Sequence, residues 1–510
     1  MFGGLTKTSS RIAIAAAFGL TLGGYALSSG PAKAADLGGD CCADLEERVA
    51  ELEATTVRKG NKKVSVTLSG WVVKTVNWWD DGDISEGHVG DKDADLASRF
   101  AITGSATIAP GWSGGYNITV TVPGAFAGQI QDGNVFGINS DQFNEDSGLL
   151  SGINTLYSYI FLKSDTWGAL NWGYLSPASD NPAVLADISG TVIESNAVLF
   201  EGSGFFLRPK GAGVGGLAGL SGLTTPVQCN SGVGNIGVDC YGAPQSGVRY
   251  DSPTWGGFRF EASWTEFLES IPMGGVPFAI GAPNIDAYDI AVFYNGDWGN
   301  FKVSAAYSYT HMDGNLLVAT NSGADVNLHQ AGATVMHVPS GLGLYGMYQN
   351  DSLDGSYFNP VTDRNQGFAD TDVWYLKPFI KRTWNPAGAT VLYGEYGQYN
   401  NQFNGFAGNN QCGAFAGLGG SAGTFCAPVI GVDTGLFVTG SEVQRWGLGV
   451  VQEIDSAAMH LFARWQHQDV SIDFVGANFV AGTGTVINSQ RVGQGFDDFN
   501  LFQVGGIIFF

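Results

Sequence analysis

Two short motifs in the sequence could support chemistry. Residues 111–115 (GWSGG) and 419–423 (GGSAG) match the G-x-S-x-G pattern of a nucleophilic serine. Residues 91–95 (DKDAD) begin like a calcium-binding loop, in which alternating carboxylates coordinate the ion. The calcium pattern fails at Leu96 and Ile102, where Gly and Glu are required, and neither serine motif lies between a strand and a helix. These residues therefore favour neither an enzyme nor a metal site, and we expect no cofactor.

Basic residues recur at alternate positions within apolar segments. In 258–264 (FRFEASW), Arg259 and Glu261 alternate with aromatic side chains, and Lys377 and Lys381 do the same further on. Successive side chains of a β-strand point to opposite faces, so one face is polar and the other apolar. A lipid-facing Arg or Lys at the bilayer midplane would cost about 2–4 kcal/mol. The alternation therefore predicts a water-filled lumen lined by Arg99, Arg249, Arg259, Lys302, Lys377, Lys381, Arg445 and Arg464.

Lys74 is the exception to this alternation. It lies in the first strand-like segment, on the apolar face that also carries Val66, Leu68 and Val72. A position near the rim and a position at a contact between subunits would both keep its charge out of lipid.

The elements that would hold these side chains are strands. From Val64 onwards the hydrophobic period is two residues, which is typical of β-structure. About sixteen barrel-length strands are expected: 64–79, 95–109, 114–123, 154–164, 168–175, 246–252, 257–267, 286–295, 301–311, 327–338, 342–350, 371–383, 389–399, 442–453, 458–469 and 497–510.

The connections between these strands alternate in length. The short ones are 110–113, 165–168, 252–256, 296–299, 339–341, 385–388 and 455–457. The long ones are 80–94, 124–153, 176–245, 268–285, 312–326, 351–370, 400–441 and 470–496. Short turns at one rim and long loops at the other are the two ends of an outer-membrane barrel. A β-sandwich has no reason for this alternation, so we predict an all-β, antiparallel, sixteen-stranded transmembrane β-barrel over 64–510.

The longest loop, 176–245, carries regularly spaced acids: Asp180, Asp187, Glu194 and Glu201. A loop of this length usually has a function or is disordered. Folded into the lumen, it would set these acids against the basic wall and narrow the passage. The alternative is an ordinary acidic surface loop.

The N-terminus has the pattern of a secretory signal peptide. A basic start (Lys7, Arg11), an apolar run (12–27) and the small-x-small site at 32–34 predict cleavage after Ala34. The chain has 24 Lys plus Arg and 47 Asp plus Glu, and the signal segment carries three of the basic residues, so the mature charge is 21 − 47 = −26. Such an acidic exported chain is not expected to bind nucleic acid.

Residues 35–63 form a separate periplasmic segment. Leu45, Val49 and Leu52 are spaced like the apolar stripe of a short amphipathic helix. Two readings stay open: a helix lying at the periplasmic rim, or a coiled coil held together by a trimeric barrel.

The six cysteines would lie in an oxidising compartment. Cys229 and Cys240 fall in one long loop, and Cys412 and Cys426 in another, so local disulfides are favoured over free thiols. Cys41 and Cys42 are adjacent and would be strained if paired with each other, but they could link subunits.

The last strand ends on Phe510, with Phe502, Val504 and Ile508 on the same face. Such an apolar edge would invite aggregation in a soluble protein, but it suits a barrel in which a neighbour pairs each side of the strand. We expect this strand to pair with 64–79 and close the cylinder, with the Phe510 face toward lipid or a neighbouring subunit.

Several stretches together resemble the trimeric general porins of alphaproteobacteria, of the rhizobial and Brucella type. They are 67–73 (TLSGWVV), 247–253 (GVRYDSP) with Gly257 and Phe258, 374–377 (WYLK), 445–459 (RWGLGVVQEIDSAAM), the terminal Phe510, and 34–37 (AADL) with 41–53 (CCADLEERVAELE). The resemblance extends over essentially the whole chain.

The resemblance implies a homotrimeric barrel in the bacterial outer membrane, passive diffusion of small hydrophilic solutes, and a third loop folded inward as the constriction. It also implies that Phe510 is the signal read by the barrel assembly machinery. We expect contacts with outer-membrane lipid and lipopolysaccharide, and periplasmic or peptidoglycan contact by residues 35–63. The alternatives are a solute-selective channel, a barrel that anchors the membrane through its N-terminal segment and an outer-membrane enzyme.

Overall fold

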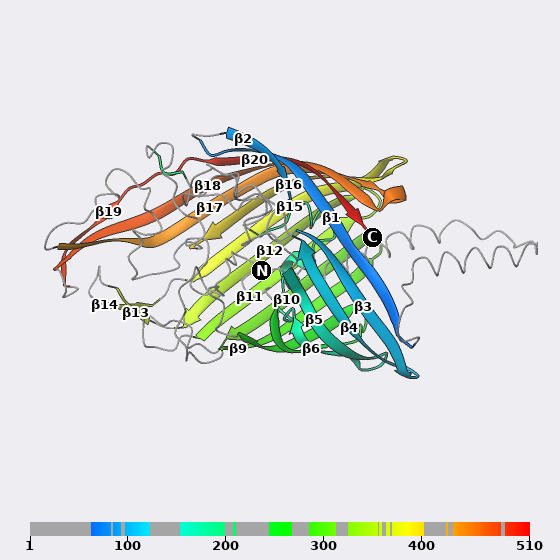
Figure 1. Cartoon of the computed structure of the whole chain (residues 1–510). Coiled ribbons are helices and arrows are strands. Elements are labelled where there is room, and N and C mark those ends of the chain that lie inside the picture. The colour runs from blue at the N-terminus through cyan, green and yellow to red at the C-terminus, as the bar shows by residue number, and fades with distance from the viewer. Residues whose placement is uncertain are drawn as a thin grey trace, which may run out of the picture.

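The chain forms a closed antiparallel β-barrel (Figure 1). The computed structural model describes residues 63–82, 85–92, 97–122, 154–198, 208–210, 244–267, 285–312, 325–354, 356–359, 364–367, 370–401, 425–426, 432–480 and 485–510. The predicted signal peptide, the segment 35–62, Glu201 and every cysteine except Cys426 lie outside the described residues. No described helix is long and apolar enough to cross a membrane.

The strands follow one another around the barrel in chain order. The first half comprises β1 (Ser65–Asp80), β2 (Ser85–Gly90), β3 (Ser98–Ala109), β4 (Trp112–Val122), β5 (Asn154–Ser164), β6 (Gly168–Leu175), β7 (Gln245–Asp251), β8 (Phe258–Phe267) and β9 (Ile285–Trp298). The second half comprises β10 (Phe301–Met312), β11 (Asp325–His337), β12 (Leu342–Asp354), β15 (Thr371–Asn385), β16 (Gly388–Asn400), β17 (Val432–Ile454), β18 (Met459–Val480), β19 (Val486–Val492) and β20 (Phe499–Phe509). The strands β13 (Ser356–Asn359) and β14 (Arg364–Gly367) form a separate hairpin.

Each position around the barrel wall, called a stave below, normally holds one continuous strand. Two of these staves are interrupted and hold two strands each. Strand β1 pairs with β3 through Ser65–Trp71 and with β2 through Thr75–Asp80, so β2 and β3 are parts of one stave. Likewise, β18 pairs with β20 over its first half and with β19 further along. The 18 strands of the sheet therefore form sixteen staves (18 − 2 = 16), which confirms the predicted strand number.

Side-chain hydroxyls fill the gap in the first interrupted stave. Ser98 Oγ accepts a hydrogen bond from Val73 N at 3.1 Å and donates to Val73 O at 3.3 Å. Thr75 Oγ1 donates to Asp91 O at 2.9 Å. Backbone groups left without a ladder partner are costly in an apolar environment, so these hydroxyls replace the missing ladder bonds.

The first and last strands close the barrel, as expected. Strand β20 pairs with β1 from Trp71↔Phe509 to Asp80↔Asn500. Phe510 extends the pairing, because its N–H donates to Gly70 O at 3.1 Å and its carbonyl accepts from Gly70 N at 2.8 Å. Phe502, Val504, Ile508 and Phe510 are exposed on the outer face, whereas Leu501, Gln503 and Ile507 are buried.

The outer surface of the barrel is apolar and banded by aromatic residues. Exposed rings near the short turns include Trp112, Trp167, Trp255, Phe258, Trp298, Phe301, Trp384 and Phe510. Exposed rings near the opposite ends of the strands include Trp78, Trp172, Trp264, Tyr288, Tyr348, Trp465 and Phe502. Two aromatic girdles flanking an apolar band are typical of a barrel that spans an outer membrane.

Strands β17 and β18 project beyond the barrel as a long hairpin, which the sequence did not predict (Figure 1). They extend about ten residues past the expected strand ends at 442 and 469. Leu436, Val438 and Phe474 in the extension join the buried core. Phe437 and Phe479 form a second apolar cluster with Ala477. The extension is therefore stabilised by packing into the buried core, by its own apolar cluster and by pairing of β18 with β19.

Candidate functional site

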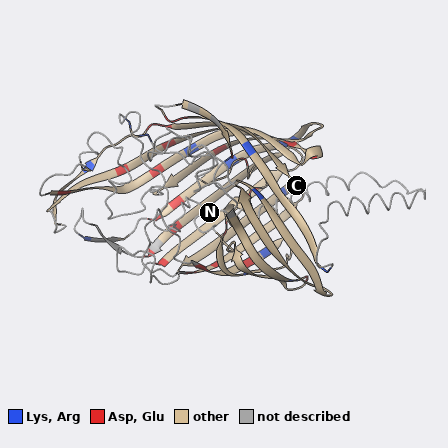
Figure 2. Ribbon diagram, viewed as in Figure 1, with Lys and Arg blue, Asp and Glu red and all other residues tan. Residues whose placement is uncertain are grey.

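The eight predicted basic residues of the wall lie on the inward register of their strands. Five of them form ion pairs with carboxylates: Arg249–Asp251 at 2.7 Å, Arg259–Glu261 at 2.7 Å, Lys377–Asp187 at 2.6 Å, Lys381–Glu453 at 2.6 Å and Arg445–Glu395 at 3.2 Å. Arg464 Nε donates to Gln503 Oε1 at 3.0 Å, and the Arg99 guanidinium stacks 4.5 Å above the Trp71 ring. Lys302 shares the face of β10 with Ser304 and Ser308. Most basic residues of the wall are thus paired with carboxylates, and Figure 2 shows Lys and Arg together with Asp and Glu along the strands.

The long loop after β6 begins on this inward face. Arg249 Nη1 donates to Ser176 O at 2.6 Å, and Ser263 Oγ accepts from Ala178 N at 2.7 Å. Ser179 Oγ donates to Asp289 Oδ1 at 2.5 Å. Asp180, the first of the predicted loop acids, is fully buried and accepts a hydrogen bond from Ser176 Oγ within the loop.

A single helical turn then packs against the wall. Helix α4 (Pro182–Leu185) starts with a proline. An N–H at the first position of a helix has no intrahelical acceptor, so proline loses no hydrogen bond there. Ala183 O accepts from Tyr345 OH at 2.9 Å, and Ala186 O accepts from Thr334 Oγ1 at 2.7 Å. A Cβ on Gly332 would lie 2.2 Å from Ala183 O, so glycine is required for this close approach.

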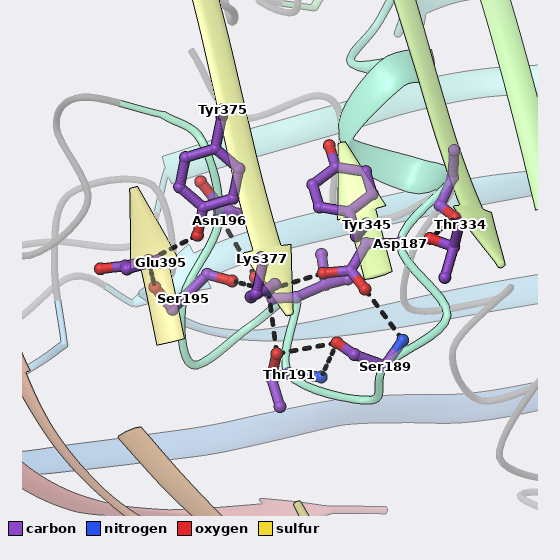
Figure 3. A network of polar contacts seen from close by, with 12 residues as sticks. Asp187, Ser189, Thr191, Ser195, Asn196, Thr334, Tyr345, Tyr375, Lys377 and Glu395 are labelled. Atoms are coloured by element: carbon purple, nitrogen blue, oxygen red, sulfur yellow. Dashed lines mark hydrogen bonds and ion pairs between the residues drawn. The ribbon is translucent and has the colours of Figure 1, made fainter. Parts of the chain in front are cut away.

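Lys377 is the centre of the next group of contacts (Figure 3). Its ammonium pairs with Asp187 and also donates to Thr191 Oγ1 at 2.9 Å and Ser195 O at 2.7 Å. The side chains of Lys377 and Asp187 are 0% and 1% exposed, so this ion pair is withdrawn from water. An ammonium has three donors, and three loop oxygens use them.

Glu395 and Arg445 hold the end of the same segment. Glu395 accepts hydrogen bonds from Ser195 Oγ and Tyr375 OH, as Figure 3 shows, and pairs with Arg445. Arg445 Nη1 donates to Val198 O at 2.9 Å. The neighbouring Tyr399 OH donates to Ala197 O at 2.7 Å.

The remaining described acid of the loop, Glu194, contacts His460 of β18. Its Oε1 lies 2.7 Å from His460 Nδ1, and the Glu194 side chain is 1% exposed. Nearby, a Cβ on Gly190 would lie 2.8 Å from Lys381 Nζ, so this turn also lies against the wall. Asp187 and Glu194 therefore point to wall residues, and their place at a constriction stays a prediction.

These contacts define a continuous arc. The segment Ser176–Val198 first touches inward residues of β7, β8, β9, β11 and β12. It then touches β15, reaches β18 through Glu194 and returns to β16 and β17 through Ala197 and Val198. The loop thus follows more than half of the inner circumference instead of crossing it as a free strand.

Of the acidic residues of the wall, the sequence indicated Glu261 but not two others. Glu395 and Glu453 were not predicted, although Glu453 is an even number of residues from Arg445 and so shares its face. Glu395 pairs with Arg445 across two strands, and that proximity depends on the register Gly397↔Arg445. The alternation in the sequence could have identified Glu453 as inward-facing. Only the structure shows which basic residues the carboxylates pair with.

Three other features considered in the sequence are the serine motif, a metal site and the cysteines. Ser113, in the first serine motif, lies on β4 directly opposite Lys163 of β5, in a pair of antiparallel strands. Within the described ranges, no group of three or more His, Cys, Asp or Glu could hold a metal. Cys426 forms a disulfide bond, and since the other cysteines lie outside the described residues, the identity of its partner stays a prediction.

Comparisons with known proteins agree with this architecture. The sequence pattern of one family, described as Gram-negative porin, matches residues 16–472. No curated protein matches the chain. The high-pH structure of Pseudomonas putida OprB is similar at 10% identity and a TM-score of 0.50, over 92% of this chain and 97% of that chain. The anion-selective porin from Comamonas acidovorans is 16% identical with a TM-score of 0.48, over 88% of this chain and 100% of that chain. At this identity, the likeness to OprB concerns the fold alone.

Proposed function

The chain belongs to the Gram-negative porin family, and from that premise we propose where its passage for solutes lies. It is an outer-membrane protein that forms a channel for passive diffusion. The passage runs between the loop segment Ser176–Val198 and the wall formed by β3–β6. Thr103 of β3 and Asn117 of β4, which are directly paired, are partly exposed on the inward register of that wall.

One observation carries this proposal: the loop is bound to the inner wall from β7 to β18 by buried contacts. A segment fixed to one side of a closed barrel narrows the lumen and leaves the remaining side for water and solutes. The loop would thereby serve as the constriction, with Asp187 and Glu194 holding it in place through Lys377 and His460.

A pair of adjacent residues on β4 tests the location. Asn117 faces inward, where its amide donates to Tyr159 OH at 3.4 Å, and Ile118 next to it is exposed on the outer face. In Asn117→Cys, a charged thiol reagent added from the aqueous phase should reduce single-channel conductance. The matched control Ile118→Cys and the unsubstituted protein should be unaffected. If the thiol reagent left the conductance of Asn117→Cys unchanged, the passage would lie elsewhere.

We propose further that the chain is an alphaproteobacterial general porin of the rhizobial and Brucella type. The stretches 67–73, 247–253 and 445–459 support this, together with the terminal Phe510. An alignment with authenticated members of that group tests the assignment.

The chain is proposed to form a homotrimer, and Lys74 supports this. Lys74 points outward from the middle of β1, with its side chain 57% exposed, and it pairs with Asp91. A lysine on a lipid-facing surface is costly, and a neighbouring copy would cover it. Native mass measurement should give three copies, and a monomer as the sole species would contradict the proposal.

The other proposed partners follow from particular segments. Phe510 is proposed as the feature read by the barrel assembly machinery, and the outer face as the contact with lipid and lipopolysaccharide. Residues 35–63 are proposed to make contacts on the periplasmic side, either with periplasmic components or with peptidoglycan. The proposed disulfides are Cys229–Cys240 and Cys412–Cys426.

A further inference from the structure

A group of uncharged side chains lies on the inner face of β3, β4 and β5, away from the arc of the loop. Its residues form two neighbouring rows across the three paired strands, and all of them are partly exposed. We call this group the neutral patch, and its rows are Thr103–Asn117–Tyr159 and Ser105–Gly115–Phe161.

Phe161 is the apolar part of the neutral patch. A Cβ on Gly115 would lie 2.4 Å from Phe161 Cζ and 2.8 Å from its Cε1, so the ring occupies the space above this glycine. Glycine within a strand often marks such a close approach. The ring therefore leans over β4 along the wall and presents apolar surface to the lumen, on which a solute can pack.

Asn117 and Tyr159 are the polar part of the neutral patch. Thr119 Oγ1 donates to Asn117 Oδ1 at 2.7 Å, and Asn117 Nδ2 donates to the Tyr159 hydroxyl at 3.4 Å. An amide nitrogen carries two N–H donors, of which this contact uses one, and a phenol both donates and accepts. The patch thus offers neutral donors and acceptors beside an aromatic ring.

The charged residues of the neighbouring wall do not enter the patch. Arg99 of β3 is only 2% exposed. Lys163 is exposed, but it lies at the end of β5 beside the short turn. On β7, Arg249 and Asp251 pair with each other at 2.7 Å. Within the described wall, the two rows are therefore bordered by charges that are buried, paired or located at the rim.

The described part of the loop also presents no exposed acid to the passage. Its three described carboxylates are buried. The partly exposed residues of 176–198 are Leu185, Ile188 and Gly190. Both borders of the proposed passage are thus uncharged over the described residues, and the selectivity of this stretch depends on hydroxyl, amide and aromatic groups.

We propose that the neutral patch is a binding site for neutral polyhydroxylated solutes of the class of pyranose sugars, with Phe161 as the surface on which the sugar ring packs. A pyranose has an apolar face of C–H groups and a rim of hydroxyls. The first matches the aromatic ring, and the second matches the amide and the phenol beside it. A charged solute would lose hydration there without gaining an ion pair. This inference rests on the proposed function, because it takes the passage to run along β3–β6.

Single-channel recording on the full-length protein tests the site, with the neutral trisaccharide raffinose in the aqueous phase. Raffinose should interrupt the current in a manner that saturates with its concentration. Polyethylene glycol of the same hydrodynamic radius has no ring to pack on Phe161, so it should lower the current without saturation. If raffinose and polyethylene glycol had the same effect, the proposal would be overturned.

Substitutions at position 161 separate the aromatic face from general apolarity. Phe161→Leu should weaken raffinose binding about tenfold, because it keeps an apolar side chain but removes the ring. Phe161→Tyr keeps the ring and should bind raffinose as the unsubstituted protein does. The matched control is Phe260→Leu, which removes an exposed ring from the outer face of β8 and should leave raffinose binding unchanged. Equal binding by Phe161→Leu and the unsubstituted protein would contradict the role of the ring.

Asn117→Asp tests the polar part with almost no change of shape. It replaces the amide donors by a charge, and raffinose binding should weaken about fivefold. The open-channel current of each variant shows that its barrel has folded. If neither the unsubstituted protein nor any variant carried current, the proposed channel function would fail, whereas normal current without saturable block by raffinose would refute the sugar site alone.

Discussion

At the scale of single residues, two contacts between the lumen wall and buried acids bind the loop: Lys377–Asp187 and His460–Glu194. Lys377 joins strand β15 to the loop through Asp187, Thr191 and Ser195. A buried ion pair is weak evidence for stability as such, because desolvation offsets much of the attraction. Its value here is specificity: only one position of the loop satisfies all the donors.

Asp187→Asn tests this role. It should leave the buried Lys377 ammonium uncompensated and destabilise the loop by about 3–5 kcal/mol. The expected readout is increased protease cleavage within 176–198 of the folded barrel, together with a reversal potential shifted toward anions. Asp187→Leu combined with Lys377→Met should recover much of the protease resistance. Equal sensitivity of the single and double variants would contradict the charge-pair account.

Gly332 offers a second test at this scale, by steric means alone. Gly332→Ala places a methyl group 2.2 Å from Ala183 O, so α4 must move from the wall. Overpacking of this kind costs about 1–3 kcal/mol. Single-channel conductance should change, because the loop moves into the lumen.

Gly346→Ala is the matched control for this substitution. It lies on the outer face, and its Cβ would lie 3.0 Å from Cδ2 at the flexible end of Leu376 and 3.7 Å from Tyr375 O, an ordinary contact. If Gly332→Ala, Gly346→Ala and the unsubstituted protein all had the same conductance, α4 would not border the passage.

At the scale of elements, alternation in the sequence was sufficient to place the strands. The sixteen predicted segments correspond to the sixteen staves, because lipid on one side and water on the other impose a strict period of two. The strands β2 and β19 were missed, because they lie within the segments 80–94 and 470–496 that were expected to be loops. Helix α4 was missed because four residues carry no periodic pattern and depend on wall contacts.

The loop was harder to predict than the wall. Its acids were identified by spacing, but their partners come from strands up to about 270 residues away along the chain, as in Glu194–His460. Such proximity follows from barrel closure and strand register, and neither can be read from one segment. Arg208 is near the predicted acids in sequence, but no role was predicted for it, because its partner Asp81 is 127 residues away along the chain.

The terminal strand provides a prediction at this scale. Deleting Phe510 removes the last paired residue of the closing ladder, both of whose backbone hydrogen bonds go to Gly70. The yield of folded, heat-modifiable barrels should fall severalfold in cells, whereas barrels that do form should conduct normally. Substituting the neighbouring lipid-facing Ile508 by Val controls for a small loss of apolar surface. Unchanged assembly without Phe510 would contradict its role as a signal.

At the scale of the whole molecule, the charge of the chain and the charge of the wall are separate quantities. The chain is strongly acidic, with a formal net charge of −23, but on the described wall most Lys and Arg are balanced by carboxylates. The net charge therefore does not set the ion preference of the passage, which depends on the residues that border it. A closed apolar exterior, a polar interior and a loop bound along the inner wall together describe a passive channel.

The most direct test of that account is the conductance of the purified protein in a planar lipid bilayer. After insertion has been verified, the account predicts steady channels whose current is proportional to voltage at low voltage and scales with salt concentration. Inserted, folded protein that carries no current would contradict it.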